Sequence, residues 1–156
     1  YKMGGDIIFD PQESVSMTGN SGVYLLYSAV RAKKILAKVE GGAEILNKKV
    51  VQKEGNRGLS KKVVQENPAE TAEFERKLYK KIVQYGEVLP AAVREKAPHK
   101  ICTYLYELAQ EFSRFYEAVP VAGSAREQER TELVRADLAV MQHGLGLLGI
   151  EVPEEM

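Results

Sequence analysis

The sequence predicts an all-α bundle of about five helices, preceded by a short irregular segment over residues 1–21. Three observations favour this class. Apolar residues recur at steps of three and four along several long stretches, as they do in helices with one buried face. The alternation that is typical of strands does not appear convincingly after residue 22. With 156 residues, 44% of them hydrophobic, the chain can bury one core, so residues 22–156 are expected to form a single all-α domain.

The first long helix is predicted over residues 23–39. A turn-forming run, Gly19-Asn20-Ser21-Gly22, precedes it, with Asn20 or Ser21 available as the N-terminal cap. The pair Gly41-Gly42 is expected to stop it. Because successive residues of a helix are about 100° apart, one stripe of this helix is apolar and should face the core. Its members are Leu25, Ala29, Ala32, Leu36 and Val39.

A second stripe of the same helix combines tyrosines with cations. It contains Tyr24, Tyr27, Ser28, Arg31, Lys34 and Lys38. Such a face suits single-stranded nucleic acid, because the rings can stack on bases while the cations meet phosphates. The pattern is equally compatible with an ordinary exposed face that carries two half-buried tyrosines.

The segment that follows is strongly basic. Residues 22–66 hold ten basic and four acidic side chains, a net charge of +6 within a chain whose total is zero. A local excess of this size can attract polyanions, but a solvated lysine-rich loop would give the same count. Residues 41–66 are therefore expected to be a basic connector with at most one short helix.

The middle of the chain predicts two helices separated by a break. Pro68 suits the first turn of a helix. Apolar residues then recur at helical spacing, with Gly86 marking the break: Phe74, Leu78, Ile82, Tyr85 and Leu89. A short helix is predicted over residues 88–96, ending before Pro98.

Two longer helices complete the predicted bundle. Over residues 99–118 the apolar stripe is regular: Ile101, Leu105, Leu108, Phe112 and Phe115. Pro120 and Gly123 end this region. The last helix, over residues 126–148, has two adjacent apolar faces and is expected to be buried on a wide front. One face contains Leu133, Ala136, Val140 and Leu147, and the other contains Val134, Leu138, Met141, Leu145 and Leu148. Three glycines near its end indicate a close helix contact or an early stop: Gly144, Gly146 and Gly149.

The residues give little support for catalysis. A nucleotide-binding glycine loop is missing, and the run at Gly19-Asn20-Ser21-Gly22 is better explained as a helix entry than as an anion site. His99 suits a helix start, and His143 is expected in the core or at its boundary. Cys102 is expected to be a small buried side chain, and as the single cysteine it excludes an internal disulfide. No metal site is expected.

The chain also lacks the features of a membrane or exported protein. Its apolar runs are far shorter than the roughly 20 residues that cross a bilayer, and no charged-then-apolar leader opens it. We therefore expect a cytoplasmic protein without membrane contacts.

Three blocks of the sequence resemble one family. The stretch GNSGVYLLYSAVRAKKIL at residues 19–36 is similar to the pattern G-x-T-G-P-Y-x-Q-Y-A-H-A-R of arginyl-tRNA synthetases. The stretch PHKICTYLYELAQEFSRFYEAVPV at residues 98–121 resembles the second signature of that family, and the ending GLGLLGIEVPEEM resembles its LLGI-x-x-P-E-R-M. The chain departs from these patterns at Val23, Leu26, Ala29 and Glu155, which leaves the hydrophobic register intact.

The resemblance implies an all-α anticodon-binding domain of the DALR type over residues 22–156, with residues 1–21 as the tail of a catalytic portion. Full-length members use ATP, with Mg²⁺, to attach arginine to its tRNA. Their HIGH and KMSK-like signatures are absent from these 156 residues, so we expect this part to be inactive alone. The implied partners are arginine tRNA, through its anticodon loop, and the chain's own catalytic domain, in a protein that is expected to be a monomer.

The resemblance also implies a set of site residues. By position, the anticodon bases would contact Tyr27, Arg31, Tyr116 and Met156. Phosphate contacts are expected from Tyr24, Lys34 and Lys38. Three alternatives remain open at this point: the anticodon module of another synthetase, a free-standing enzyme, and a helical protein-interaction domain whose basic segment only aids solubility.

Overall fold

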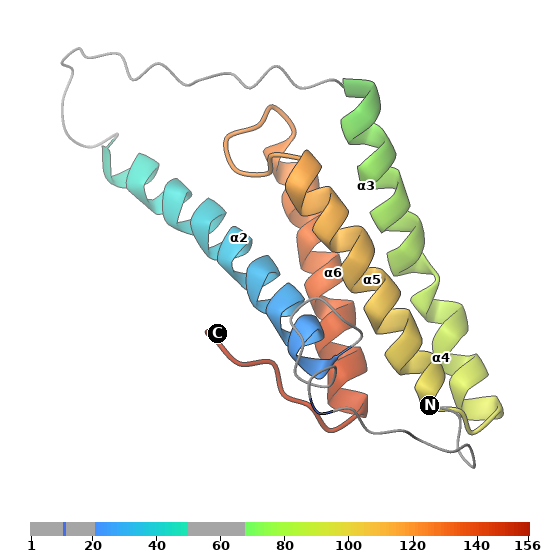
Figure 1. Ribbon diagram of the computed structural model, residues 1–156. Helices are drawn as coiled ribbons and strands as arrows, with labels where there is room; N and C mark the ends of the chain where they lie inside the picture. The colour runs from blue at the N-terminus through green and yellow to red at the C-terminus, as the bar shows by residue number, and fades with distance from the viewer. Residues whose placement is uncertain (1–10, 12–20, 50–67) are drawn as a thin grey trace.

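A computed structural model describes residue 11 and residues 21–49 and 68–156, and for residues 42–49 and 68 it describes the backbone alone (Figure 1). The helices in this part of the chain are α2 (Gly22–Lys49), α3 (Pro68–Val83), α4 (Tyr85–Arg94), α5 (His99–Ala118) and α6 (Glu127–Leu147). The described ranges contain no strand, which confirms the all-α class. The predicted irregular segment over residues 1–21 lies almost wholly outside these ranges, as does the connector from residue 50 to residue 66.

The first helix begins as predicted but does not end as predicted. The Ser21 hydroxyl accepts a hydrogen bond from the Tyr24 amide at 3.2 Å, so Ser21 caps the helix. The expected stop at Gly41-Gly42 is wrong, because α2 continues to Lys49. A glycine inside a helix costs only about 0.5–1 kcal/mol. At this point Glu40 accepts a hydrogen bond from Arg135 of α6 at 2.9 Å, so α2 and α6 are in contact there.

The break in the middle of the chain falls slightly earlier than predicted. Gln84, rather than Gly86, separates α3 from α4, and Gly86 lies inside α4. Consequently α4 begins at Tyr85 instead of residue 88 and ends at Arg94. Lys96 lies beyond that end, with a φ of 50°. The predicted start of α3 at Pro68 is confirmed.

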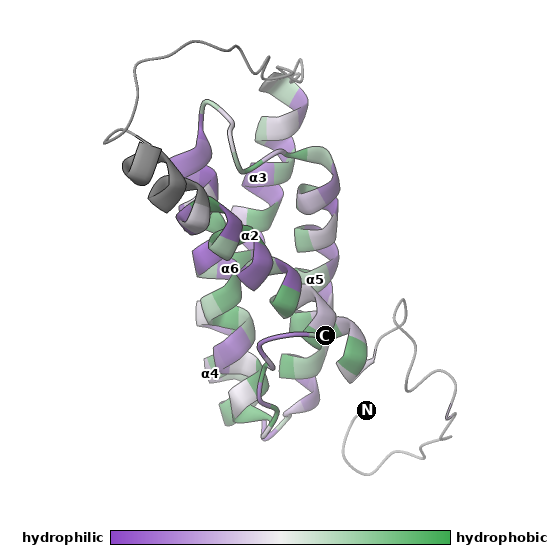
Figure 2. Ribbon diagram, turned by 90° about the vertical axis from the view of Figure 1, so that its left-hand side faces the viewer, coloured by the Kyte–Doolittle hydropathy of each residue, from purple (hydrophilic) through white to green (hydrophobic). Residues whose placement is uncertain are grey.

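The centre of the bundle is α5, whose bounds match the prediction. It contacts α2, α3, α4 and α6, with α2 on one side and the α3–α4 pair on the other (Figure 1). Its buried residues include the whole predicted stripe: Ile101, Tyr104, Leu105, Leu108, Ala109, Phe112 and Phe115. Hydrophilic and hydrophobic residues alternate along the helices, as expected when each has one buried face (Figure 2).

The last helix is buried on a narrower front than the sequence indicates. Val134, Leu138, Met141 and Leu145 are buried, but Ala136 is exposed and 51% of the Leu147 surface is accessible. The predicted close contact is present at Gly144, where an added Cβ would lie 2.7 Å from a methyl group of Leu105. Gly149, with a φ of +75°, lies just after the helix and suits its end.

In the described ranges, no helix combines the length and the hydrophobicity that a membrane span requires.

Candidate nucleic-acid interface

Tyr27, Arg31 and Tyr116 lie together where α2 passes the end of α5. The guanidinium carbon of Arg31 lies 4.9 Å from the centre of the Tyr27 ring and 4.4 Å from that of Tyr116. One cation therefore contacts two aromatic rings that come from two different helices. Tyr27 and Arg31 are both partly accessible and share one face of α2, as the periodicity predicted.

Tyr116 is anchored at the edge of the core. Its ring centre lies 6.4 Å from that of Phe112, which is fully buried, and the preceding residue Phe115 is also fully buried. Tyr116 itself remains 41% exposed. Packing therefore holds the ring in place while leaving surface for a ligand, which is the geometry that a stacking site needs.

A groove of about 520 Å³ extends from this cluster. It lies between α2, the end of α5 and the segment that joins α5 to α6. Its lining residues are Arg31, Lys34, Ile35, Lys38, Tyr116, Glu117, Val119, Pro120, Val121 and Ala122. Three of them are cations and one is a carboxylate, so the groove carries positive charge.

The three cations of the groove are available to a ligand. Arg31, Lys34 and Lys38 form no ion pair with any residue in the described part of the chain. Lys34 and Lys38 are exposed, and the Arg31 guanidinium lies over the rings of Tyr27 and Tyr116. The stacked guanidinium keeps its N–H groups free for hydrogen bonds to phosphate or to base edges.

Two residues of the predicted cationic stripe lie elsewhere. Ser28 is 1% exposed and belongs to the buried side of α2, so its assignment to the outer stripe is wrong. The reason is that α2 packs against both α5 and α6 and buries a wider face than a single stripe. Tyr24 is half-buried, with its hydroxyl 3.3 Å from the Ser113 hydroxyl and its ring 5.6 Å from that of Tyr106. It does not line the groove, and its phosphate contact stays a prediction.

The C-terminal segment is held against α2 by Lys33. The Lys33 ammonium donates to the carbonyl oxygens of Val152 at 3.4 Å and Pro153 at 3.2 Å, and to the Glu154 carboxylate at 2.7 Å. Met156, two residues further on, is 51% exposed. Because Lys33 holds the preceding residues, Met156 lies on the α2 side of the bundle. It forms no hydrogen bond with Tyr27, Arg31 or Tyr116. Sequence periodicity gave no signal for the role of Lys33.

The remaining candidate residues are structural. His99 begins α5 as predicted. His143 is exposed rather than in the core, with Nδ1 2.6 Å from the Tyr85 hydroxyl. Cys102 is only partly buried. Across the described residues, no group of His, Cys, Asp and Glu could hold a metal ion.

Sequence reasoning missed one unusual buried carboxyl group. Asp137 of α6 is fully buried, and among the described residues neither of its carboxylate oxygens has a hydrogen-bond partner. Burial raises the pKa of the Asp137 carboxyl well above its usual range. The burial of Asp137 was predictable, because position 137 lies on the same helical face as Val134 and Met141. Asp137 does not line the groove.

Comparisons with known proteins agree on one family. The family model of the DALR anticodon binding domain matches residues 25–156. The chain is 37% identical over 154 residues to an arginine–tRNA ligase of Shewanella putrefaciens, and 36% identical over 152 residues to one of Hyphomonas neptunium. These alignments cover 97% and 96% of this chain but only 23% of each relative.

Solved structures show the same likeness. The arginyl-tRNA synthetase of Thermus thermophilus superposes with a TM-score of 0.70 at 30% identity, over 95% of this chain and 23% of that one. A putative arginyl-tRNA synthetase of Campylobacter jejuni superposes with a TM-score of 0.67 at 23% identity, over 92% of this chain and 28% of the other, and this likeness concerns the fold alone.

Proposed function

We propose, because the chain belongs to the family of DALR anticodon-binding domains, that it recognises the anticodon loop of a tRNA in the groove between α2 and the end of α5. The observation that carries this proposal is the contact of Arg31 with the rings of Tyr27 and Tyr116, beside Lys34 and Lys38, which form no ion pair with the residues that the structure describes. Rings and cations in one accessible groove are what an unpaired, charged RNA loop requires.

The binding energy would come from stacking and from charge. An unpaired base stacked on Tyr27 or Tyr116 contributes about 1–3 kcal/mol. Lys34 and Lys38 would hold phosphates as point charges, without sequence preference. Tyr24 is retained as a third phosphate contact and Met156 as a further base contact, the latter because Lys33 holds the preceding residues on the same helix.

We further propose that the tRNA is specific for arginine and that the chain serves as the anticodon-binding part of an arginine–tRNA ligase. Support comes from the names of the relatives, which are arginine–tRNA ligases about four times as long as this chain. Activation of arginine with ATP and Mg²⁺ would belong to a catalytic portion that these residues do not include. A monomer that works in the cytoplasm, apart from membranes, fits this role.

A titration of tRNA at two salt concentrations tests the proposed binding. If Lys34 and Lys38 each neutralise one phosphate of the loop, the logarithm of the association constant should fall with the logarithm of the salt concentration with a slope of about −1.4. A protein-interaction domain, the alternative class, would show no such binding.

Two tyrosine replacements test the assignment of the site: Tyr116 lines the groove, and Tyr27 lies beside it in contact with Arg31. Tyr27→Ala and Tyr116→Ala should each weaken tRNA binding about 5- to 150-fold, since one stacked base is lost, while folding is nearly unchanged. Tyr79→Ala is the matched control, because Tyr79 is 61% exposed on α3 and neither lines the groove nor makes a ring contact with Arg31. Affinities equal to wild type for both Tyr27→Ala and Tyr116→Ala would remove the assignment.

A further inference from the structure

We infer that Arg130 is a positioning residue of the proposed RNA groove. Arg130 does not line the groove but contacts the segment that joins α5 to α6 from the other side, and so orients that segment. This inference rests on the proposed function. Residues 119–122 join α5 to α6 and form one wall of the groove beside Tyr116. Arg130 of α6 is bonded to that wall and to α3 at the same time.

The guanidinium of Arg130 is buried and joins two separate elements. Only 2% of the Arg130 surface is exposed. Its Nη1 donates a hydrogen bond to the carbonyl oxygen of Pro120 at 2.7 Å. Its Nε donates to Oε1 of Glu75, on α3, at 2.8 Å. One rigid, planar group therefore fixes the distance between α3 and the wall of the groove.

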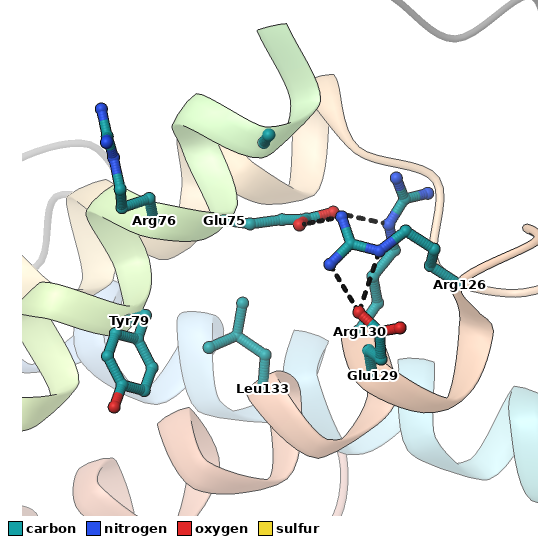
Figure 3. Close-up of a pocket in the computed structure, with 8 residues that line it drawn as sticks. Glu75, Arg76, Tyr79, Arg126, Glu129, Arg130 and Leu133 are labelled. Carbon is teal, nitrogen blue, oxygen red and sulfur yellow. Dashed lines mark hydrogen bonds and ion pairs between the residues drawn. The ribbon is translucent and has the colours of Figure 1, made fainter. Parts of the chain in front are cut away.

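A second arginine holds Glu75 in place. Nη1 of Arg126 lies 2.6 Å from Oε2 of Glu75, so each oxygen of this carboxylate accepts from a different guanidinium. Arg126 also donates from Nε to the Glu129 carboxylate at 2.9 Å. Figure 3 shows the resulting cluster, in which the guanidinium groups of Arg126 and Arg130 point toward Glu75 of α3. The cluster leaves the Glu75 carboxylate little freedom to rotate.

The connecting segment is otherwise held mainly by apolar packing. Val119 and Val121, on either side of Pro120, are 2% and 7% exposed. The Ser124 hydroxyl donates to the Val121 carbonyl at 3.0 Å, which closes the turn that follows. Packing keeps the segment against the bundle, whereas the Arg130 bond gives the Pro120 carbonyl a defined direction and so fixes how Pro120 contributes to the lining of the groove.

A guanidinium is suited to this task and an ammonium is not. Its fixed fork can bond a carboxylate and a carbonyl in one geometry, while lysine offers a point charge on a flexible stem. Buried ion pairs contribute little net stability compared with apolar packing, so stability alone does not explain why a buried arginine stands here.

Arg130→Lys is the test, because it keeps the charge opposite Glu75 while removing the fork. We expect faster amide hydrogen exchange at Val121, Gly123 and Ser124, with exchange in α5 and α6 unchanged. Affinity for an RNA stem-loop carrying an arginine tRNA anticodon should fall about 2- to 30-fold, the usual range for residues that act through another element. Adding Tyr116→Ala to Arg130→Lys should cost less than the sum of the two separate losses.

Two controls make the outcome decisive. Arg135→Lys alters an arginine of the same helix that is 47% exposed and pairs with Glu40 and Glu132, so it should change neither readout. If Arg130→Lys does not fold, Glu75→Gln should show the same changes in the same direction, because it removes the negative charge and one of the two acceptor oxygens that hold the Arg130 and Arg126 guanidinium groups.

Unchanged exchange in the segment, or unchanged RNA affinity despite faster exchange, would overturn the inference. Failure of the proposed function would look different, because the wild-type chain would then bind no RNA while the exchange measurement still reports on the Arg130 bond.

Discussion

Arg31 and Arg130 show two uses of the same side chain in one small bundle. Arg31 is partly accessible, lies against two tyrosine rings and has no carboxylate partner among the described residues. Arg130 is buried and bonded to Glu75 and to the Pro120 carbonyl. Ring contacts leave the N–H donors of a guanidinium free, whereas carboxylate and carbonyl partners occupy them. The first arrangement suits a ligand and the second suits the fold.

Two neighbouring lysines of α2 repeat this contrast. Lys33 bonds to the C-terminal segment and has 16% of its side chain exposed. Lys34 is exposed and lines the groove. Because adjacent residues of a helix point about 100° apart, a single step along α2 separates a side chain that stabilises the fold from one that can bind RNA.

The largest expected effect is the difference in stability between two alanine substitutions, one at Arg130 and one at Arg31. Arg130→Ala should lower the free energy of unfolding by about 2–5 kcal/mol, because Oε1 of Glu75 and the Pro120 carbonyl both lose their buried donor, although Arg126 still pairs with Oε2 of Glu75. Arg31→Ala should lower it by about 1 kcal/mol or less, the usual value of an accessible cation–ring contact. Urea denaturation of both variants measures the difference, and similar losses would abolish the contrast.

The next largest effect concerns Asp137, a buried carboxyl group that, unlike Glu75, has no hydrogen-bond partner among the described residues. Because burial raises the pKa of Asp137 in the folded chain, the folded state binds this proton more tightly than the unfolded state, where the pKa is about 4. The stability from this group is therefore fully present below pH 4. It falls, by at most about 1.4 kcal/mol per pH unit, as the pH rises from there to the raised pKa.

The Asp137→Asn variant isolates this contribution. Its free energy of unfolding, measured in urea from pH 4 upward, should fall less with pH than that of the wild-type chain. The difference between the two profiles matters, since the lowered pKa values of Glu73 and Glu95 give the opposite slope at lower pH in both proteins. Parallel profiles would mean that Asp137 is solvated or paired in solution.

A smaller effect is expected where α6 approaches α5. Gly144→Ala should lower the free energy of unfolding by about 1–3 kcal/mol, because its Cβ would meet the fully buried Leu105. Gly146→Ala, two residues further on, should raise it by about 0.5–1 kcal/mol, since nothing lies within 4 Å of that position. Thermal unfolding of the two variants measures this difference. A higher stability in both would show that α5 and α6 have room to move apart.

The smallest effect on stability is expected at the C-terminal segment. Lys33→Gln should change the free energy of unfolding by about 1 kcal/mol or less, because the Glu154 partner is 90% exposed. Its consequence should appear instead as faster amide exchange at residues 154–156 and, if Met156 contacts a base, as weaker tRNA binding. Lys34→Gln is the neighbouring control and should weaken tRNA binding without altering exchange in the segment.

The sequence by itself determined what lies within single helices. The bounds and the buried stripe of α5 were predictable, because its apolar residues follow one unbroken period between Pro98 and Pro120. The shared face of Tyr27 and Arg31 was predictable for the same reason, since four residues nearly complete one helical turn. The family resemblance, which rests on short ordered blocks, added Tyr116 to that face as an expectation.

Only the tertiary structure decided what joins one helix to another. In the structure, α2 continues through Gly41-Gly42, Tyr116 lies against Arg31, and Arg130 is buried between Glu75 and the Pro120 carbonyl. Local periodicity gives the angle of a side chain about its own helix axis. Which partner that side chain meets depends on how the helices cross, and this is settled by the packing of the whole core.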